Sequence, residues 1–175
     1  MSFTYLRIAA VGTALVAAMF SHAAAQQSAR KSYFHPTLRM AIEQPDPKRW
    51  SVEINKIDFG LGCLVCGKGA DTWIFIYPST DGFADINATL ADITTYFEKE
   101  ESLKIGEVRR EAISDGEIAW TEQPGSKRPF LGAVKHGSDY FFLQMSTEKT
   151  MIATNNDLRA DFLAAARSVR IWNGR

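Results

Sequence analysis

The sequence is poor in the residues on which metal sites and redox centres depend. It has two cysteines, Cys63 and Cys66, and three histidines among 175 residues. A structural zinc site takes four ligands, and these residues do not have the spacing of a zinc finger. No serine lies in a G-x-S-x-G pattern, which removes a common sign of a serine hydrolase.

Net charge is also absent. The 20 Lys and Arg residues balance 20 Asp and Glu residues, so the formal net charge is zero. A near-neutral chain has no electrostatic reason to bind nucleic acid or an anionic membrane, and neither is predicted as a partner. Heptads, internal repeats and low-complexity tracts are missing too, which excludes coiled coils and repeat architectures.

The first residues have the pattern of a secretory signal peptide. The apolar run at residues 8–20 has 13 residues and leads to small residues at Ala23 and Ala25, which fit the signal peptidase pocket. A membrane-spanning helix needs about 20 residues, so no anchor is predicted after cleavage. We expect a signal peptide at residues 1–25, a flexible leader at 26–34 and a single domain at 35–175.

Strands are predicted where apolar and polar residues alternate or where β-branched and aromatic residues cluster. Within residues 50–59 the alternation slips by one position, which predicts a bulge or a twist. Asp115-Gly116 and residues 136–139 predict the turns of two hairpins. The run at 72–77 is apolar throughout and predicts a central strand. The predicted strands are residues 38–42, 50–59, 72–77, 105–113, 117–122, 130–135 and 140–145.

Two helices are predicted from apolar residues at helical spacing. Asp85 is a plausible N-cap for residues 85–101, and a second helix starts near Asn156. Hairpin connections produce antiparallel strands. The predicted fold class is therefore α+β, with a single antiparallel sheet of about six to seven strands in a hairpin meander and two helices packed on it.

The order of these elements resembles the PsbP/Mog1-like family, which includes small secreted bacterial domains. The residues that carry the resemblance are His35-Pro36, Trp50-Ser51, the helix at 85–101, the hairpins at 105–145 and the closing helix that ends at residues 167–171. It rests on element order and the placement of aromatic residues. The resemblance implies a non-catalytic accessory or binding domain and carries over no catalytic residues.

Residues 60–69 hold both cysteines within a frame of four glycines. In an oxidising compartment Cys63 and Cys66 are expected to form a structural disulfide in a loop between two strands. Two alternatives stay open: thiol–disulfide exchange through the pair, and a metal held by Cys63, Cys66, His35 and His136. A redox-active pair favours a first cysteine that opens a helix, whereas a strand is predicted after this pair.

Other candidate site residues are aromatic or basic. Both His35 and His136 are expected in turns or at the surface, although a small hydrolase would depend on one of them. A ligand groove would be lined by exposed aromatic residues, for which the candidates are Trp73, Phe83, Trp120 and Trp172.

These patterns predict an exported, non-catalytic binding or accessory domain of the bacterial cell envelope, in the periplasm or secreted. Its partner would be an unknown protein or small molecule, and no cofactor is expected. The alternative is a periplasmic thiol–disulfide or metal-handling protein that acts through Cys63 and Cys66.

Overall fold

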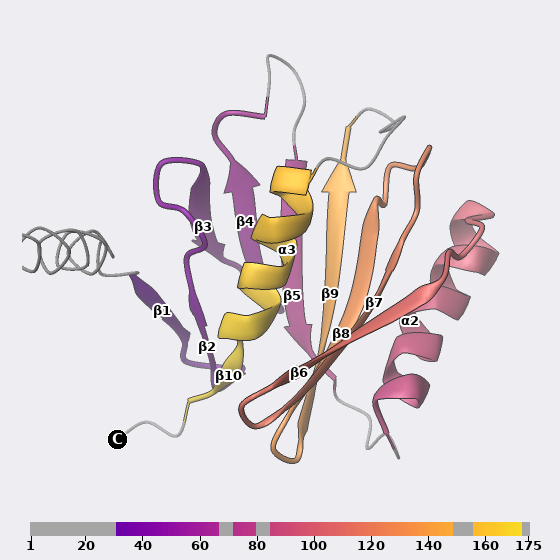
Figure 1. Cartoon of the computed structure of the whole chain (residues 1–175). Helices are drawn as coiled ribbons and strands as arrows, with labels where there is room; N and C mark the ends of the chain where they lie inside the picture. Colours follow the sequence, from indigo (N-terminus) through magenta and orange to yellow (C-terminus); the bar gives the residue numbers. More distant parts are fainter. Residues whose placement is uncertain (1–30, 67–71, 80–84, 149–155, 173–175) are drawn as a thin grey trace, which may run out of the picture. The chain divides into compact units, whose positions relative to one another are not determined.

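A computed structural model describes residues 31–66, 72–79, 85–148 and 156–172. They belong to one compact unit that begins at Lys31. Two antiparallel sheets and two helices make up this part of the chain, which is a mixed α+β fold (Figure 1). The predicted signal peptide at residues 1–25 and Phe83 of the predicted groove lie outside the described residues.

The larger sheet has seven strands in the order β3-β4-β5-β9-β8-β7-β6, and every neighbouring pair is antiparallel. Its central strand is β9, in which apolar residues face both sides. The run predicted as a central strand, residues 72–77, is β5, an interior strand next to β9. The four strands β6 to β9 form the predicted meander of hairpins. The bounds are β3 Trp50–Ile54, β4 Phe59–Cys63, β5 Thr72–Pro78, β6 Val108–Ile113, β7 Gly116–Glu122, β8 Phe130–His136 and β9 Asp139–Thr147.

The prediction of a single sheet is wrong in one respect. Strands β1 (Ser32–His35), β2 (Met40–Glu43) and β10 (Arg170–Ile171) form a separate sheet of three strands. Met40, Ala41 and Ile42 are all buried, because β2 packs under a helix instead of extending the larger sheet. β2 also pairs with the distant strand β10, and no local sequence pattern indicates such a partner. Strand β1 also shortens the predicted leader, because it pairs with β2 from Ser32 onward.

The strand predicted at residues 50–59 is two strands joined by a turn. The backbone N–H of Asn55 donates to the carbonyl of Asp58 at 3.0 Å, which closes the turn between β3 and β4. The slip in alternation therefore marks a hairpin and not a bulge.

The glycine-framed stretch at residues 60–69 is also part strand, because Gly60 and Gly62 lie within β4 beneath the indole ring of Trp73. A Cβ at Gly62 would lie 2.9 Å from that ring, so the glycines make room for it.

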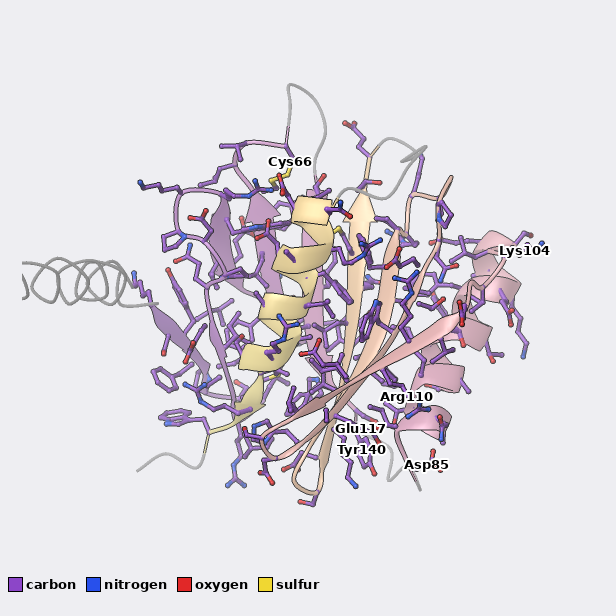
Figure 2. The ribbon with its side chains drawn as sticks, in the orientation of Figure 1. Cys66, Asp85, Lys104, Arg110, Glu117 and Tyr140 are labelled. Atoms are coloured by element: carbon purple, nitrogen blue, oxygen red, sulfur yellow. A yellow bond between two sulfur atoms is a disulfide. The ribbon has the colours of Figure 1, made fainter. Side chains whose placement is uncertain are left out.

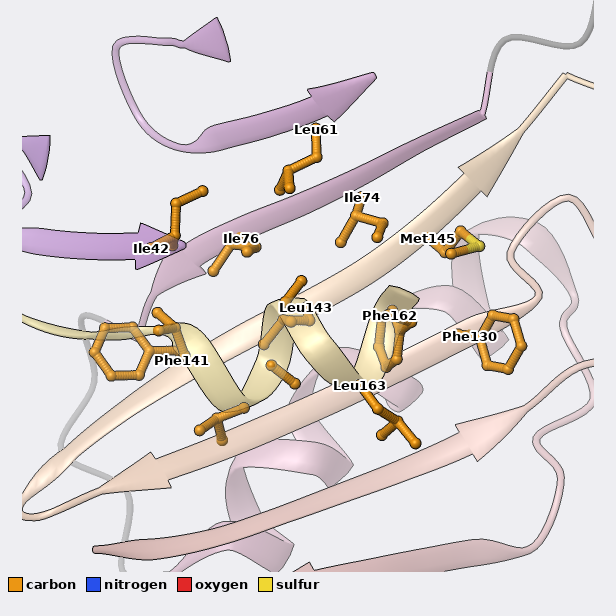
Figure 3. Close-up of a cluster of buried hydrophobic side chains, with 14 of the residues drawn as sticks. Ile42, Leu61, Ile74, Ile76, Phe130, Phe141, Leu143, Met145, Phe162 and Leu163 are labelled. Atoms are coloured by element: carbon orange, nitrogen blue, oxygen red, sulfur yellow. The ribbon is translucent and has the colours of Figure 1, made fainter. Parts of the chain in front are cut away.

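Helix α3 (Asn156–Ser168) and the small sheet cover one face of the larger sheet. Phe162 of α3 stacks on Phe130 of β8, with ring centroids 5.4 Å apart (Figure 3). The ring of Phe162 also lies over Gly132, where an added Cβ would be 3.1 Å away. This face holds the larger hydrophobic core, including the strand residues Leu61, Ile74, Ile76, Phe141, Leu143 and Met145.

Helix α2 (Ile86–Glu101) covers the opposite face over β7, β8 and β9. The side chain of Asp85 accepts hydrogen bonds from the backbone N–H groups of Asn87 at 2.8 Å and Ala88 at 2.9 Å, which confirms the predicted N-cap. The predicted apolar stripe packs on Ala119, Leu131 and Ala133 and forms a second, smaller core.

We expect Phe162→Ala to lower the free energy of unfolding by about 3–5 kcal/mol, because it leaves a cavity between α3 and the sheet. Urea denaturation measures the change. Tyr96→Ala removes an aromatic side chain that is 59% exposed, so this control should change stability by about 0.5 kcal/mol. Equal effects of the two substitutions would contradict the packing of α3 described above.

Candidate functional site

A disulfide joins Cys63 and Cys66, with their Cα atoms 5.7 Å apart. Cys63 is the last residue of β4, and both cysteines pack against the larger core. Figure 2 shows Cys66 at the end of the sheet opposite to Tyr140. The pair therefore follows a strand and does not begin a helix, which is the geometry of a clamp at a strand end. Leu64 and Val65, between the cysteines, are 61% and 58% exposed.

The two histidines are separate and serve local structure. His35 is buried, which corrects its predicted place in a turn or at the surface. Its Nδ1 accepts a hydrogen bond from the Leu38 N–H at 3.1 Å, and its Nε2 then donates to the Asn55 carbonyl at 2.5 Å. The Nδ1 of His136, at the end of β8, lies 3.3 Å from a carboxylate oxygen of Asp115. Within the described ranges, no three His, Cys, Asp or Glu residues are placed to hold a metal ion.

The aromatic residues predicted to line a groove do not gather at one place. Trp73 lies on the α2 side of β5, whereas Trp120 is buried in the core on the α3 side of β7. Trp172 follows β10, and its ring centroid is 5.1 Å from that of Phe34. Of the three candidates that the structure describes, Trp73 alone lies on the face that has an aromatic cleft.

This cleft runs along α2, where the helix ends its coverage of the sheet. Its volume is about 470 Å³, which is within the range of small-molecule sites. One wall comes from α2 and the other from β5 and β9. The lining residues of the walls are Asp92, Ile93, Tyr96, Phe97 and Glu101 on α2, Tyr77 on β5, and Phe142 and Gln144 on β9. We call this site the α2 cleft.

Gln144 is the unusual residue of the α2 cleft. It stands opposite Phe75 on one neighbouring strand and Leu131 on the other, so its flanks are apolar. Its side-chain oxygen Oε1 is buried and has no hydrogen-bond partner in the part of the chain that the structure describes. A buried acceptor without a donor is unfavourable by about 1–3 kcal/mol. A ligand with an N–H or O–H group could satisfy it.

Arg128 closes one end of the α2 cleft. Its guanidinium donates to Glu101 of α2 at 2.8 and 3.1 Å and to the hydroxyl of Ser146 on β9. It also lies over the ring of Phe97, 5.3 Å from the centroid. These contacts tie the end of α2 to the sheet and fix the width of the cleft there.

Tyr77 contributes a phenol that keeps its proton. Burial raises the pKa of Tyr77 above its ordinary value, and the nearby charge of Arg128 opposes part of this shift. The phenol is therefore un-ionised at neutral pH and offers an O–H donor beside the aromatic rings.

Sequence reasoning missed Tyr96, Arg128 and Gln144. A signal for Gln144 is nevertheless present, because it is the one polar residue in the apolar run Tyr140-Phe141-Phe142-Leu143-Gln144-Met145. Nothing in the sequence brings Arg128, in the connection between β7 and β8, to the end of a helix that is 27 residues away.

Replacing both cysteines by serine should lower the free energy of unfolding by only about 2 kcal/mol, because the closed loop is short. The cysteines are separated by 3 positions. Urea denaturation of Cys63→Ser/Cys66→Ser, compared with oxidised wild type in the absence of a reductant, measures the change. A variant that is unfolded without urea would show that the disulfide holds more than the end of β4.

In the described ranges, no helix combines the length and the apolar character that a membrane crossing requires. No protein-family model matches the chain, and no curated protein matches it either. Function must therefore be argued from the geometry of the site.

Proposed function

We propose that the protein is an exported, non-catalytic binding domain of the bacterial cell envelope and that it holds an apolar, ring-bearing ligand in the α2 cleft. The observation that carries this proposal is the unpartnered Oε1 of Gln144 within an aromatic lining. Evolved pockets of this kind combine apolar walls with a few polar groups that fix the orientation of the ligand.

The chemistry of the lining favours binding. Tyr77, Tyr96 and Phe142 present aromatic rings to the α2 cleft, and such rings pack on other rings with about 0.5–1.5 kcal/mol beyond the burial of area. Gln144 Oε1 adds one acceptor, so the preferred ligand has a hydrogen-bond donor next to its ring. The carboxylate of Glu101 is already engaged by Arg128.

Other observations support the location and the type of function. The disulfide between Cys63 and Cys66 fits an oxidising compartment outside the cytoplasm. The resemblance to the PsbP/Mog1-like family, in which accessory and binding roles are expected, agrees with this proposal. The sheet flanked by helices on both faces is compatible with that resemblance.

The second candidate function is thiol–disulfide exchange through Cys63 and Cys66. It is favoured by the exposure of Leu64 and Val65 between the cysteines, which leaves this turn open to a partner protein. Cys63 packs with the core on the α3 side, whereas the α2 cleft is on the other face. The two functions would therefore use different surfaces and can be tested separately.

The test uses N-phenylnaphthylamine, a fluorophore with aromatic rings and one N–H donor. We expect its fluorescence to rise on binding to the purified protein. Tyr96→Ala should weaken binding by about three- to tenfold through the loss of a ring contact. Gln144→Leu should weaken binding by about tenfold, yet raise the free energy of unfolding by about 1 kcal/mol because it removes an unsatisfied acceptor.

Two controls bound this test. Ile57→Ala removes a side chain that is 69% exposed outside the cleft and should bind the fluorophore as wild type does. Cys63→Ser/Cys66→Ser should also keep its affinity. Binding that is unchanged in both cleft variants would overturn the proposal, and binding lost only in the cysteine variant would place the fluorophore at the cysteine turn and overturn it too.

A further inference from the structure

A second cavity lies where the small sheet meets the hairpin turns of the large sheet. Its volume is about 680 Å³. Figure 1 shows β10 at the same end of the large sheet as the turns of the β6–β7 and β8–β9 hairpins. This turn-end cavity shares no lining residue with the α2 cleft, so it is a separate site.

Arg39 lines the turn-end cavity, and its backbone has a conformation that arginine rarely adopts. It is the last residue of the turn between β1 and β2 and has a φ of 52°. Glycine is the residue that fits this left-handed conformation without steric conflict. The turn is held by its backbone, because the Arg39 carbonyl accepts from the Trp172 N–H at 2.7 Å. The arginine side chain is therefore not needed to form the turn.

The guanidinium of Arg39 is unpaired. It is exposed and has neither a hydrogen bond nor an ion pair with any described residue. Arg170 lines the same cavity, and its Nη1 donates to Glu43 at 3.3 Å and to the Ser168 carbonyl at 3.4 Å, whereas its other guanidinium nitrogens have no hydrogen bond to a described residue. The cavity therefore has a cationic side with free donors, and guanidinium groups match the geometry of a carboxylate.

The opposite charge in the cavity is also unpaired. Asp139, at the start of β9, has no hydrogen bond or ion pair among residues 31–66, 72–79, 85–148 and 156–172. The other lining carboxylate, Asp115, is occupied by His136 at 3.3 Å. Arg39 and Asp139 thus line one cavity with opposite charges that are too far apart to form an ion pair with each other.

One side of the turn-end cavity is apolar. Leu38 and Ile171 line it and are partly buried against the larger core. An apolar group of a ligand could cover them, whereas its charged groups would face Arg39 and Asp139.

We propose that the turn-end cavity binds a small zwitterion with an apolar side chain, a free α-amino acid or a short peptide. Its carboxylate binds Arg39 with Arg170 beside it, its ammonium group binds Asp139, and its side chain rests on Leu38 and Ile171. A single ligand with both charges satisfies the two unpaired groups at once, which a simple anion or cation cannot do.

Calorimetric titration with four related compounds tests the ligand class. Leucine carries both charges, N-acetylleucine keeps only the carboxylate, and leucinamide keeps only the ammonium group. We expect leucine or leucyl-leucine to bind about 10- to 100-fold more tightly than either singly charged compound, because each lost charge removes a charged hydrogen bond. Preference for leucyl-leucine over leucine would identify peptides as the ligand. Equal affinity for N-acetylleucine and leucine, or no binding by any of the four, would overturn the proposal.

Arg39→Gly separates binding from folding. Glycine suits the positive φ, so the melting temperature should stay the same or rise, whereas leucine affinity should fall by about 10- to 100-fold. Asp139→Asn is the second variant, and its affinity for leucine should fall to that of wild type for N-acetylleucine. Arg109→Gln removes an exposed guanidinium elsewhere on the large sheet and is expected to bind leucine normally. Unchanged leucine binding in Arg39→Gly or in Asp139→Asn would contradict the assignment.

Discussion

The central strand β9 has two apolar faces, and the rest of the structure depends on covering both. Phe141, Leu143 and Met145 face α3 and the small sheet, where they form the larger core. Phe142 faces the other way, toward α2. Helix α2 has its main contacts with β7, β8 and β9. On β5, Trp73 and Phe75 stack on each other at this same face, and Trp73 lies over the glycines of β4.

The α2 cleft is a consequence of that uneven coverage. If α2 covered more of the sheet, it would pack on Tyr77 and Gln144. The buried oxygen of Gln144 would then lie in a closed core. Instead, both residues line an opening whose end is closed by Arg128. At one end of the larger sheet, the turns of the β6–β7 and β8–β9 hairpins meet the small sheet and form the turn-end cavity. The glycine-framed cysteine stretch, by contrast, serves the fold: its glycines admit Trp73 and its disulfide secures the end of β4.

The parts of the fold that depend on near neighbours could be predicted from the sequence. Helix α2, its cap Asp85 and the hairpins around Asp115-Gly116 and Gly137 follow from local periodicity and turn chemistry. The pairing of β2 with β10 could not be predicted, because it joins residues about 130 positions apart, such as Ala41 and Arg170. The sequence favours loop positions for Gly60 and Gly62, since glycine weakens strands in general, and only the position of Trp73 explains their place in β4.

The site was less predictable than the fold. Large aromatic residues were a poor guide to an exposed groove, because Trp73 and Trp172 are half-buried and the strand position of Trp120 turns its side chain into the core. The polar interruption at Gln144 was a better guide, since a buried amide is retained in an apolar strand only if something compensates for it. No sequence pattern identifies Arg39 as a site residue, because what sets it apart is its positive φ angle.

Binding in the α2 cleft is tested most directly by an amide NMR titration of the purified protein with N-phenylnaphthylamine. We expect the largest shifts on α2 between Asp92 and Glu101 and on the facing residues of β5 and β9, with the amides of Leu64 and Val65 unmoved. Shifts confined to the turn between Cys63 and Cys66, or no shifts at saturating fluorophore, would contradict the assignment of the cleft as the ligand site.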